Sequence, residues 1–196
     1  MSFSLDDITR AVQRAPQRLT YDGADLAAVA AIITPDLDLI LIRRAAHLGD
    51  PWSGQVSFPG GRMEPDDESP LDTAIRETKE ELGVSLSKTM LLGELDVLPT
   101  LTPLPKLLVH PFVFATDQRP EGTPNGEVAS VHSIGLDVLL RGDGRGTMTI
   151  PWRGQPLVLP RVDFDDIRLW GMTLRMVDDL LDRLDGCGVG LDRLGR

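Results

Sequence analysis

The hydrophobic positions of the chain follow two periods, one typical of strands and one typical of helices. Apolar runs bounded by glycine, proline and aspartate predict strands over 25–34 and 37–44, joined as a hairpin near Pro35 and Asp36. Further segments of strand character are 54–61, 90–99, 107–116, 127–136 and the pair 147–152 and 156–162, which has the pattern of a second hairpin. Apolar residues three and four positions apart predict helices over 4–15, 71–82 and 169–184. This order of elements predicts an α/β fold in which a mixed sheet lies between helices.

The central helix carries clear signals at both ends. Ser69 is a good N-cap, Pro70 suits the first helical position, and Gly83 suits the position just after the last turn. At about 100° per residue, one apolar stripe forms along the helix. Its members are Leu71, Ala74, Ile75, Thr78 and Leu82.

A second face of this helix gathers three carboxylates, Glu77, Glu80 and Glu81. Glu77 and Glu81 are four positions apart, so they are neighbours and repel each other by a few tenths of a kcal/mol in an isolated helix. A divalent cation would reverse the sign of that interaction, and carboxylates with room for water are what Mg²⁺ selects. The alternative is a solvated acidic helix face.

Size and charge narrow the class of protein. A chain of 196 residues with 41% hydrophobic and 26% charged residues is typical of one globular domain. Its net charge of −10 argues against nucleic acid or an anionic membrane as a partner through bulk electrostatics. An anionic substrate must therefore be attracted locally, by a metal ion and by arginines.

No segment indicates export or membrane insertion. The longest apolar run, 26–33, is too short to span a bilayer, and the first ten residues carry acids where a secretion signal has bases. The single cysteine, Cys187, excludes an internal disulfide. We therefore expect a cytoplasmic protein.

The segment from Gly61 to Val84 resembles the Nudix box, G-x5-E-x7-R-E-U-x-E-E-x-G-U, where U is apolar. The sequence RETKEELGV, from Arg76 to Val84, matches its second half, with Thr78 at the first apolar position. The first half is one residue longer than the consensus. The box glutamate is therefore Glu68 when counted back from Arg76, and Asp67 when counted forward from Gly61.

A one-residue insertion of this kind is similar to the coenzyme A diphosphatase branch of the family. LIRRAAHLGDPWSGQVSFPGG, residues 41–61, resembles the upstream signature of that branch, and WGMT at 170–173 resembles a later one. Two departures are present: Gly49 stands where the signature has a second arginine, and one extra residue precedes Gly54. The resemblance covers about residues 25–184.

The resemblance implies an α/β/α sandwich and a metal-dependent hydrolase that cleaves a diphosphate linked to a nucleoside, with Mg²⁺ or Mn²⁺ as cofactor. It implies a Nudix domain over 25–185, with an N-terminal helix and lead-in at 1–24 and a flexible tail at 186–196. The partner is a small nucleoside-diphosphate substrate, most simply coenzyme A or an acyl derivative. The oligomeric state is not readable from the sequence.

The resemblance also implies roles for the residues of the box. Glu77 and Glu81 are the expected metal ligands, and Glu80 is either a third ligand or a catalytic acid behind them. The Gly61 carbonyl is a further candidate ligand. Arg76 is expected to pair with Glu68 or Asp67 and so to fix the loop to the helix, with an ordinary surface pair as the alternative.

Candidates outside the box are less specific. Glu127, just before a predicted strand, is either the general base or a solvated turn residue. Arg43 and Arg44 end an apolar strand, so at least one can face a phosphate, although a solvated strand end is equally possible for either. Trp52 flanks the glycine turn and is a candidate for stacking on a base or lining a pantetheine channel. Gly60 and Gly61 are expected to expose main-chain groups to the substrate.

The remaining residues near these motifs have simpler interpretations. Phe58 is interpreted as a core residue, and His110 and His132, within predicted strands, as core or surface residues rather than catalytic ones.

Other functions are compatible with the same residues. The substrate could instead be ADP-ribose, a dinucleotide or a nucleoside triphosphate. A Nudix-fold module that binds a nucleotide without cleaving it is a second class, against which the intact E-x-x-E-E argues. A structural cation site in EPDDE, residues 64–68, lacks the alternating ligands of an EF-hand loop.

Overall fold

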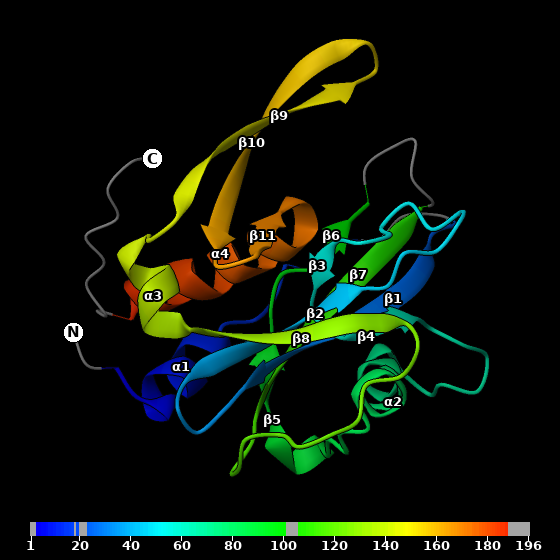
Figure 1. Ribbon diagram of the computed structural model, residues 1–196. Helices are drawn as coiled ribbons and strands as arrows, with labels where there is room; N and C mark the ends of the chain where they lie inside the picture. The colour runs from blue at the N-terminus through cyan, green and yellow to red at the C-terminus, as the bar shows by residue number, and fades with distance from the viewer. Residues whose placement is uncertain (1–2, 18, 20–22, 101–105, 188–196) are drawn as a thin grey trace.

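The computed structural model describes residues 3–17, 19, 23–100 and 106–187 (Figure 1). The helices are α1 (Leu5–Val12), α2 (Pro70–Leu82), α3 (Leu136–Arg141) and α4 (Gly171–Gly186), with a 3-10 turn at Lys88–Met90. The strands are β1 (Asp25–Ile33), β2 (Asp38–Arg44), β3 (Val56–Ser57), β4 (Gly60–Arg62), β5 (Leu91–Glu94), β6 (Leu98–Pro99), β7 (Leu107–Ala115), β8 (Val128–Gly135), β9 (Arg145–Trp152), β10 (Gln155–Phe164) and β11 (Ile167–Trp170). None of these described helices is long and apolar enough to cross a membrane.

Two sheets are present. The larger has eight strands in the order β3-β2-β1-β7-β5, with β4 paired to β1, β6 to β7 and β8 to β2. It is mixed, because β1 and β7 run parallel over their whole length whereas the other pairs are antiparallel. The smaller sheet has the order β11-β10-β9, and its long β9–β10 hairpin extends away from the larger sheet (Figure 1).

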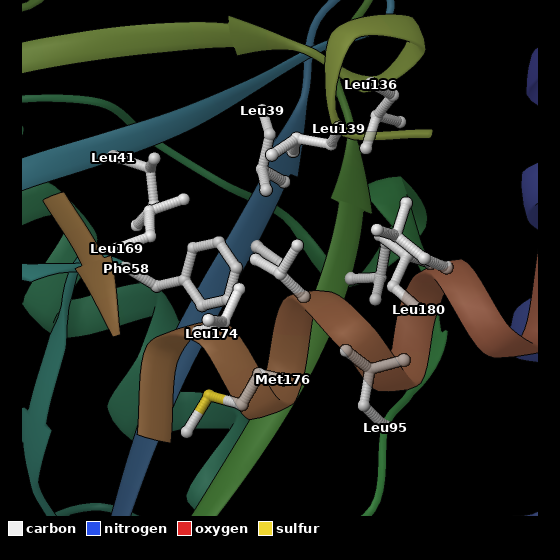
Figure 2. Packing of buried hydrophobic residues seen from close by; sticks show 14 of the residues in the cluster. Leu39, Leu41, Phe58, Leu95, Leu136, Leu139, Leu169, Leu174, Met176 and Leu180 are labelled. Atoms are coloured by element: carbon white, nitrogen blue, oxygen red, sulfur yellow. The ribbon is translucent and has the colours of Figure 1, made fainter. Parts of the chain in front are cut away.

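Helices cover both faces of the larger sheet, as the sequence predicts. On one face, Ala74 and Leu82 of α2 pack with Ile40, Ile42 and Phe112 of the sheet. On the other face, a larger cluster joins the sheet to α1, α3 and α4 (Figure 2). The apolar residues of α4 at helical spacing, Leu174, Val177, Leu180, Leu181 and Leu184, are all buried in it. The fold is therefore an α/β/α sandwich.

The sequence predicts single strands over 54–61 and 90–99, and this prediction is wrong because each segment is divided into two short strands. The segment 54–61 forms two short strands, of which β3 pairs with β2 and β4 pairs with β1. The break lies at Phe58 and Pro59, where the Pro59 carbonyl accepts from the Ala30 N–H at 2.8 Å and proline offers no N–H of its own. The segment 90–99 is likewise divided into β5 and β6, both on β7. Phe58 is buried, as predicted.

The helix boundaries also differ from the predicted ones. Helix α4 begins at Gly171, because the preceding residues 167–170 form β11 against β10. Helix α1 is shorter than 4–15 and packs Ile8, Ala11 and Val12 into the same core as α4. The short helix α3 follows β8 directly and is absent from the sequence prediction. Of the predicted C-terminal tail, residues 188–196 lie outside the described residues.

Candidate active site

The acidic helix α2 begins and ends as its sequence predicts. Ser69 has an extended backbone and its hydroxyl accepts from the Asp72 N–H at 3.3 Å, while Pro70 occupies the first helical turn. Gly83 ends the helix in the left-handed conformation, with φ of 70°. These local signals fix which turn of the helix carries each carboxylate.

Two glycines bring strand β4 close to this helix. Gly60 has φ of 149°, and a Cβ there would lie 2.2 Å from the Ala28 carbonyl oxygen. A Cβ on Gly61 would lie 2.4 Å from Oε1 of Glu77. Backbone atoms therefore exclude a side chain at Gly60, whereas a side chain at Gly61 would displace the Glu77 carboxylate, which lies directly against it.

Glu81 is the most deeply buried of the acids, which the helical periodicity does not predict. It is 1% exposed, and its Oε2 accepts from the Gly60 N–H at 2.8 Å. Burial raises the pKa of Glu81 to about 7, because the hydrogen bond from Gly60 only partly offsets the loss of hydration and Glu77 adds repulsion. An ionised Glu81 therefore lacks sufficient counter-charge within the protein alone.

Because of this raised pKa, the free energies of unfolding of the wild type and of Glu81→Gln should differ by an amount that depends on pH. Between 4.5, its ordinary value, and 7, the folded protein keeps a proton that the unfolded chain releases, so the folded state loses stability as pH rises. Glu81→Gln should therefore be more stable than the wild type by about 3 kcal/mol at pH 8 in chelator, at about 1.36 kcal/mol per pKa unit. Urea unfolding at pH 8 and pH 4.5 measures this.

The difference between the two proteins should fall to a few tenths of a kcal/mol at pH 4.5, where the folded carboxyl keeps its proton and the unfolded one is half ionised. Addition of Mg²⁺ at pH 8 should also reduce it, by stabilising the wild type. A glutamine variant that is less stable than the wild type at pH 8 would contradict this account of Glu81.

Arg76 pairs with Asp67, which decides between the two alternatives left by the sequence. Its Nε and Nη2 donate to the two carboxylate oxygens of Asp67 at 3.0 and 2.9 Å. Its remaining donors reach Glu77 Oε1 and Glu80 Oε2, both at 3.0 Å, and the Arg62 carbonyl. The hydrogen bonds from Arg76 hold the pKa of Asp67 well below its usual range, whereas Glu68 is exposed.

Asp67→Asn should therefore lower the free energy of unfolding at pH 7 by about 1.5–3 kcal/mol, the range for hydrogen bonds to charged groups. Asp67 also accepts from the Glu64 N–H and the Thr73 hydroxyl, so the whole acidic loop loses its attachment. Glu68→Gln is the matched control and should change stability by less than about 0.5 kcal/mol. Thermal unfolding of both variants tests this, and a larger loss in Glu68→Gln would reverse the assignment.

The donor set of α2 and β4 suits a hard divalent cation. Glu77 and Glu81 provide carboxylate oxygens beside the Gly61 main chain, and burial raises the pKa of Glu77 even though Arg76 opposes the shift. Among the described residues, no group of three His, Cys, Asp or Glu side chains is already arranged so that it could hold a metal ion. Instead, Nη1 of Arg76 bridges Glu77 and the half-exposed Glu80, while Glu81 accepts from the Gly60 N–H.

The loop before β8 places Glu127 near these acids. The Asn125 N–H donates to the carbonyl of Glu81 at 2.9 Å, and a Cβ on Gly122 would lie 1.9 Å from the Leu82 carbonyl oxygen. The Asn125 side chain then accepts from the Glu127 N–H at 2.9 Å. Glu127 is exposed, and its charge contributes to raising the pKa of both Glu77 and Glu81.

Of the two candidate arginines, Arg44 faces the carboxylates. Its Nη1 lies 3.9 Å from Glu81 Oε1, while its Nε and Nη2 donate to Asp50 Oδ2 at 3.1 and 2.8 Å. Asp50 also accepts from the Trp52 N–H, so it holds the loop after β2 in place. The sequence interpretation missed Asp50, because a lone aspartate in a Gly-Asp-Pro turn resembles ordinary turn chemistry. The nearby Gly49 has φ of 91°, a conformation that disfavours an arginine there.

Arg43 and Trp52 lie on the other side of the sheet. Along β2, Ile40 and Ile42 belong to the core cluster under α2, whereas Leu39 and Leu41 belong to the cluster under α4. Because side chains alternate, Arg43 projects toward the α4 side, where Trp52 is half-buried against the same cluster. There the Arg43 guanidinium contacts Asp166 in the β10–β11 turn, a partner that no local sequence signal indicates.

Comparison with known proteins identifies the family. The NUDIX domain model matches residues 24–149. The chain belongs to the Nudix family. It is 30% identical to the Nudix hydrolase NudL of Photorhabdus laumondii, over 86% of this chain and 89% of that one. It is 45% identical to NudL of Yersinia pestis over a shorter region, 34% of this chain and 33% of that one. The protein is therefore a Nudix hydrolase.

Solved structures of Nudix proteins share the fold. A MutT protein of Methanosarcina mazei aligns with a TM-score of 0.57 at 16% identity, over 87% of this chain and 99% of that one. A MutT/nudix family protein of Enterococcus faecalis aligns with a TM-score of 0.52 at 20% identity, over 87% and 64%. At these identities the likeness establishes the Nudix fold alone.

Proposed function

We propose that this Nudix hydrolase cleaves the diphosphate of coenzyme A or an acyl derivative, giving adenosine 3′,5′-bisphosphate and a 4′-phosphopantetheine. The observation that supports this substrate is a contact between two segments that resemble the coenzyme A branch. The Thr173 hydroxyl of WGMT donates to the carbonyl of Val56, within GQVSFPGG, at 3.1 Å. Segments more than 100 positions apart thus form one structure on the α4 side of the sheet, where Val56 pairs with Arg43.

The proposed mechanism assigns each side chain a task. Glu77, Glu81 and the Gly61 carbonyl would hold Mg²⁺ or Mn²⁺, with Glu80 at their outer edge. The ion, when bound, neutralises phosphate charge and acidifies water. Arg44 attracts the diphosphate, and Arg76 keeps the acidic loop against α2. Water attacks one phosphorus, the bridging P–O bond breaks, and Glu127 takes the proton from the water.

Glu127→Gln should lower kcat by about 10²-fold, toward the lower end of the range for general bases. The lower end is expected because Glu127 is exposed, so a solvent water molecule can accept the proton when the carboxylate is absent. The pH–rate profile should lose its acidic limb. Glu121→Gln, in the same exposed loop, is the control and should retain the wild-type rate. A Glu127→Gln variant with unchanged rate and profile would return Glu127 to the role of a surface residue.

The substrate is tested by comparing kcat/KM for coenzyme A, dephospho-coenzyme A and ADP-ribose on one preparation, with products identified by mass. Coenzyme A should be the best of the three. Its pantetheine arm provides remote binding energy that positions the diphosphate. Faster turnover of ADP-ribose than of both coenzyme A forms would replace this proposal with a broader nucleoside-diphosphate hydrolase.

A further inference from the structure

Four polar side chains from three separate segments meet on the α4 side of the larger sheet. Arg43 is the last residue but one of β2, Ser130 and His132 lie next to it on β8, and Asp166 comes from the β10–β11 turn. Ser130 is opposite Arg43 and His132 is opposite Leu41, so all three sheet residues project from one face. This group plays no part in the metal chemistry proposed above.

Arg43 and His132 present hydrogen-bond donors toward Asp166, and Ser130 contacts the far nitrogen of His132. Arg43 Nη2 donates to Oδ2 of Asp166 at 3.1 Å and to its backbone carbonyl. Ser130 Oγ lies 2.7 Å from His132 Nε2. When the serine hydroxyl donates there, a neutral imidazole carries its proton on Nδ1, which lies 3.7 Å from Asp166 Oδ1. That distance is too long for a hydrogen bond, so Asp166 leaves the His132 donor unsatisfied.

The hydrogen-bond donors lie on the sheet and are held in place, whereas their acceptor, Asp166, lies on an exposed turn. The His132 side chain is only 17% exposed and belongs to the sheet, whereas the Asp166 side chain is 68% exposed on a turn. An exposed carboxylate with one good partner can leave at little cost. A phosphate group has more acceptor oxygens and more charge than the carboxylate, so it can accept from Arg43 and from His132 Nδ1 at once, while the Ser130 hydroxyl stays bonded to His132 Nε2.

We propose that Arg43 and His132 bind a phosphate monoester of the substrate, with Ser130 fixing the His132 tautomer, and that Asp166 takes the place of the phosphate when none is bound. This inference rests on the proposed function, because coenzyme A carries such a group at its 3′ position. Arg43 and Arg44 are consecutive and project from opposite faces at the end of β2. A nucleotide lying across that strand end can present its diphosphate to Arg44 and its second phosphate to Arg43.

The same residues fit nucleophilic serine chemistry less well. A Ser-His-Asp triad needs a buried aspartate that hydrogen-bonds to the histidine. Here Asp166 is exposed, is too far from His132 and is already bound by Arg43. The arrangement therefore favours anion binding.

Calorimetric titration with adenosine 3′,5′-bisphosphate and with AMP tests the site without any turnover. Both ligands carry a 5′-phosphate, and only the bisphosphate carries a second phosphate monoester, at the 3′ position. The wild type should bind the bisphosphate about 10–100-fold more tightly, the range for charged hydrogen bonds. Arg43→Gln should remove most of this preference, and Ser130→Ala part of it. Equal affinity of the wild type for both ligands would overturn the inference, whatever the enzyme cleaves.

Two further variants separate binding from structural damage. Asp166→Asn removes the competing charge and should increase the preference for the bisphosphate, which a damaged fold cannot mimic. Arg119→Gln breaks another Arg–Asp pair, between the loop after β7 and Asp38 at the opposite end of β2, and should leave the preference unchanged. A preference that is unmoved in both Arg43→Gln and Asp166→Asn would also overturn the inference.

The identity of the substrate is tested by a separate measurement, the kcat/KM values for coenzyme A, dephospho-coenzyme A and ADP-ribose. If coenzyme A is cleaved better than dephospho-coenzyme A and Arg43→Gln leaves that ratio intact, the site is wrong and the proposed function stands. If the bisphosphate preference follows the predicted pattern but ADP-ribose is the best substrate, the site stands and the coenzyme A assignment fails.

Discussion

Replacing Glu77 or Glu81 by glutamine should lower kcat by about 10³-fold, near the upper end for loss of one electrostatic contact to a transition state. Each change removes a negative charge from the expected metal position while keeping the shape of the side chain. The glutamine oxygen can still accept from Arg76 at position 77 and from the Gly60 N–H at position 81. The fold should therefore persist and only the chemistry should be lost.

Steady-state kinetics with saturating Mg²⁺, together with thermal unfolding of each variant, measures this. Glu68→Gln is the matched control, because Glu68 lies in the same box, loses the same charge and faces solvent. It should retain kcat within about 2-fold of the wild type, as expected for a surface change away from the reacting groups. Near-normal turnover in Glu77→Gln or Glu81→Gln would show that the replaced residue is not a metal ligand.

The two effects expected of Glu81→Gln have opposite signs, and this is informative. Activity should fall, whereas stability at pH 8 without metal should rise, because the wild type buries a carboxylate that only a cation could compensate. A residue kept for packing would lose stability on substitution. A rise in stability with a loss of turnover would mark Glu81 as a functional group held at an energetic cost.

Local signals in the sequence were sufficient for the helices that position the site. Ser69 and Gly83 determine the ends of α2 through their own backbone preferences, so its bounds and its acidic face follow from the sequence. The apolar spacing in α4 likewise predicts its buried face. Such features depend on residues within one or two turns, and one sequence contains them completely.

Features that depend on distant segments were not predictable in the same way. The burial of Glu81 follows from Gly60, 21 positions earlier, which lies against it only after β4 pairs with β1. The division of 54–61 into β3 and β4 depends on which strands lie on either side. Asp166 meets Arg43 across 123 positions, and nothing in the β10–β11 turn itself indicates that contact.

Arg183 connects three segments from inside the protein, and its loss should have the largest effect on stability. Its side chain is 0% exposed. It donates to Asp179 Oδ1 at 2.9 Å within α4, to Asp96 Oδ1 at 2.6 Å after β5, and to the carbonyls of Arg14 and Glu94. Asp96 also accepts from the Gln17 N–H, so this one guanidinium ties the chain after α1 to the sheet and to α4.

Arg183→Met should lower the free energy of unfolding by about 3–5 kcal/mol, because it leaves two carboxylates and two carbonyls without their buried donor. Arg183→Lys keeps the charge but not the planar fork, so an intermediate loss is expected. Arg175→Met, on the exposed face of the same helix, is the control and should cost less than about 1 kcal/mol. Urea unfolding at pH 7 measures all three. A loss in Arg183→Met no larger than in Arg175→Met would mean that the buried network adds nothing beyond apolar packing of α4.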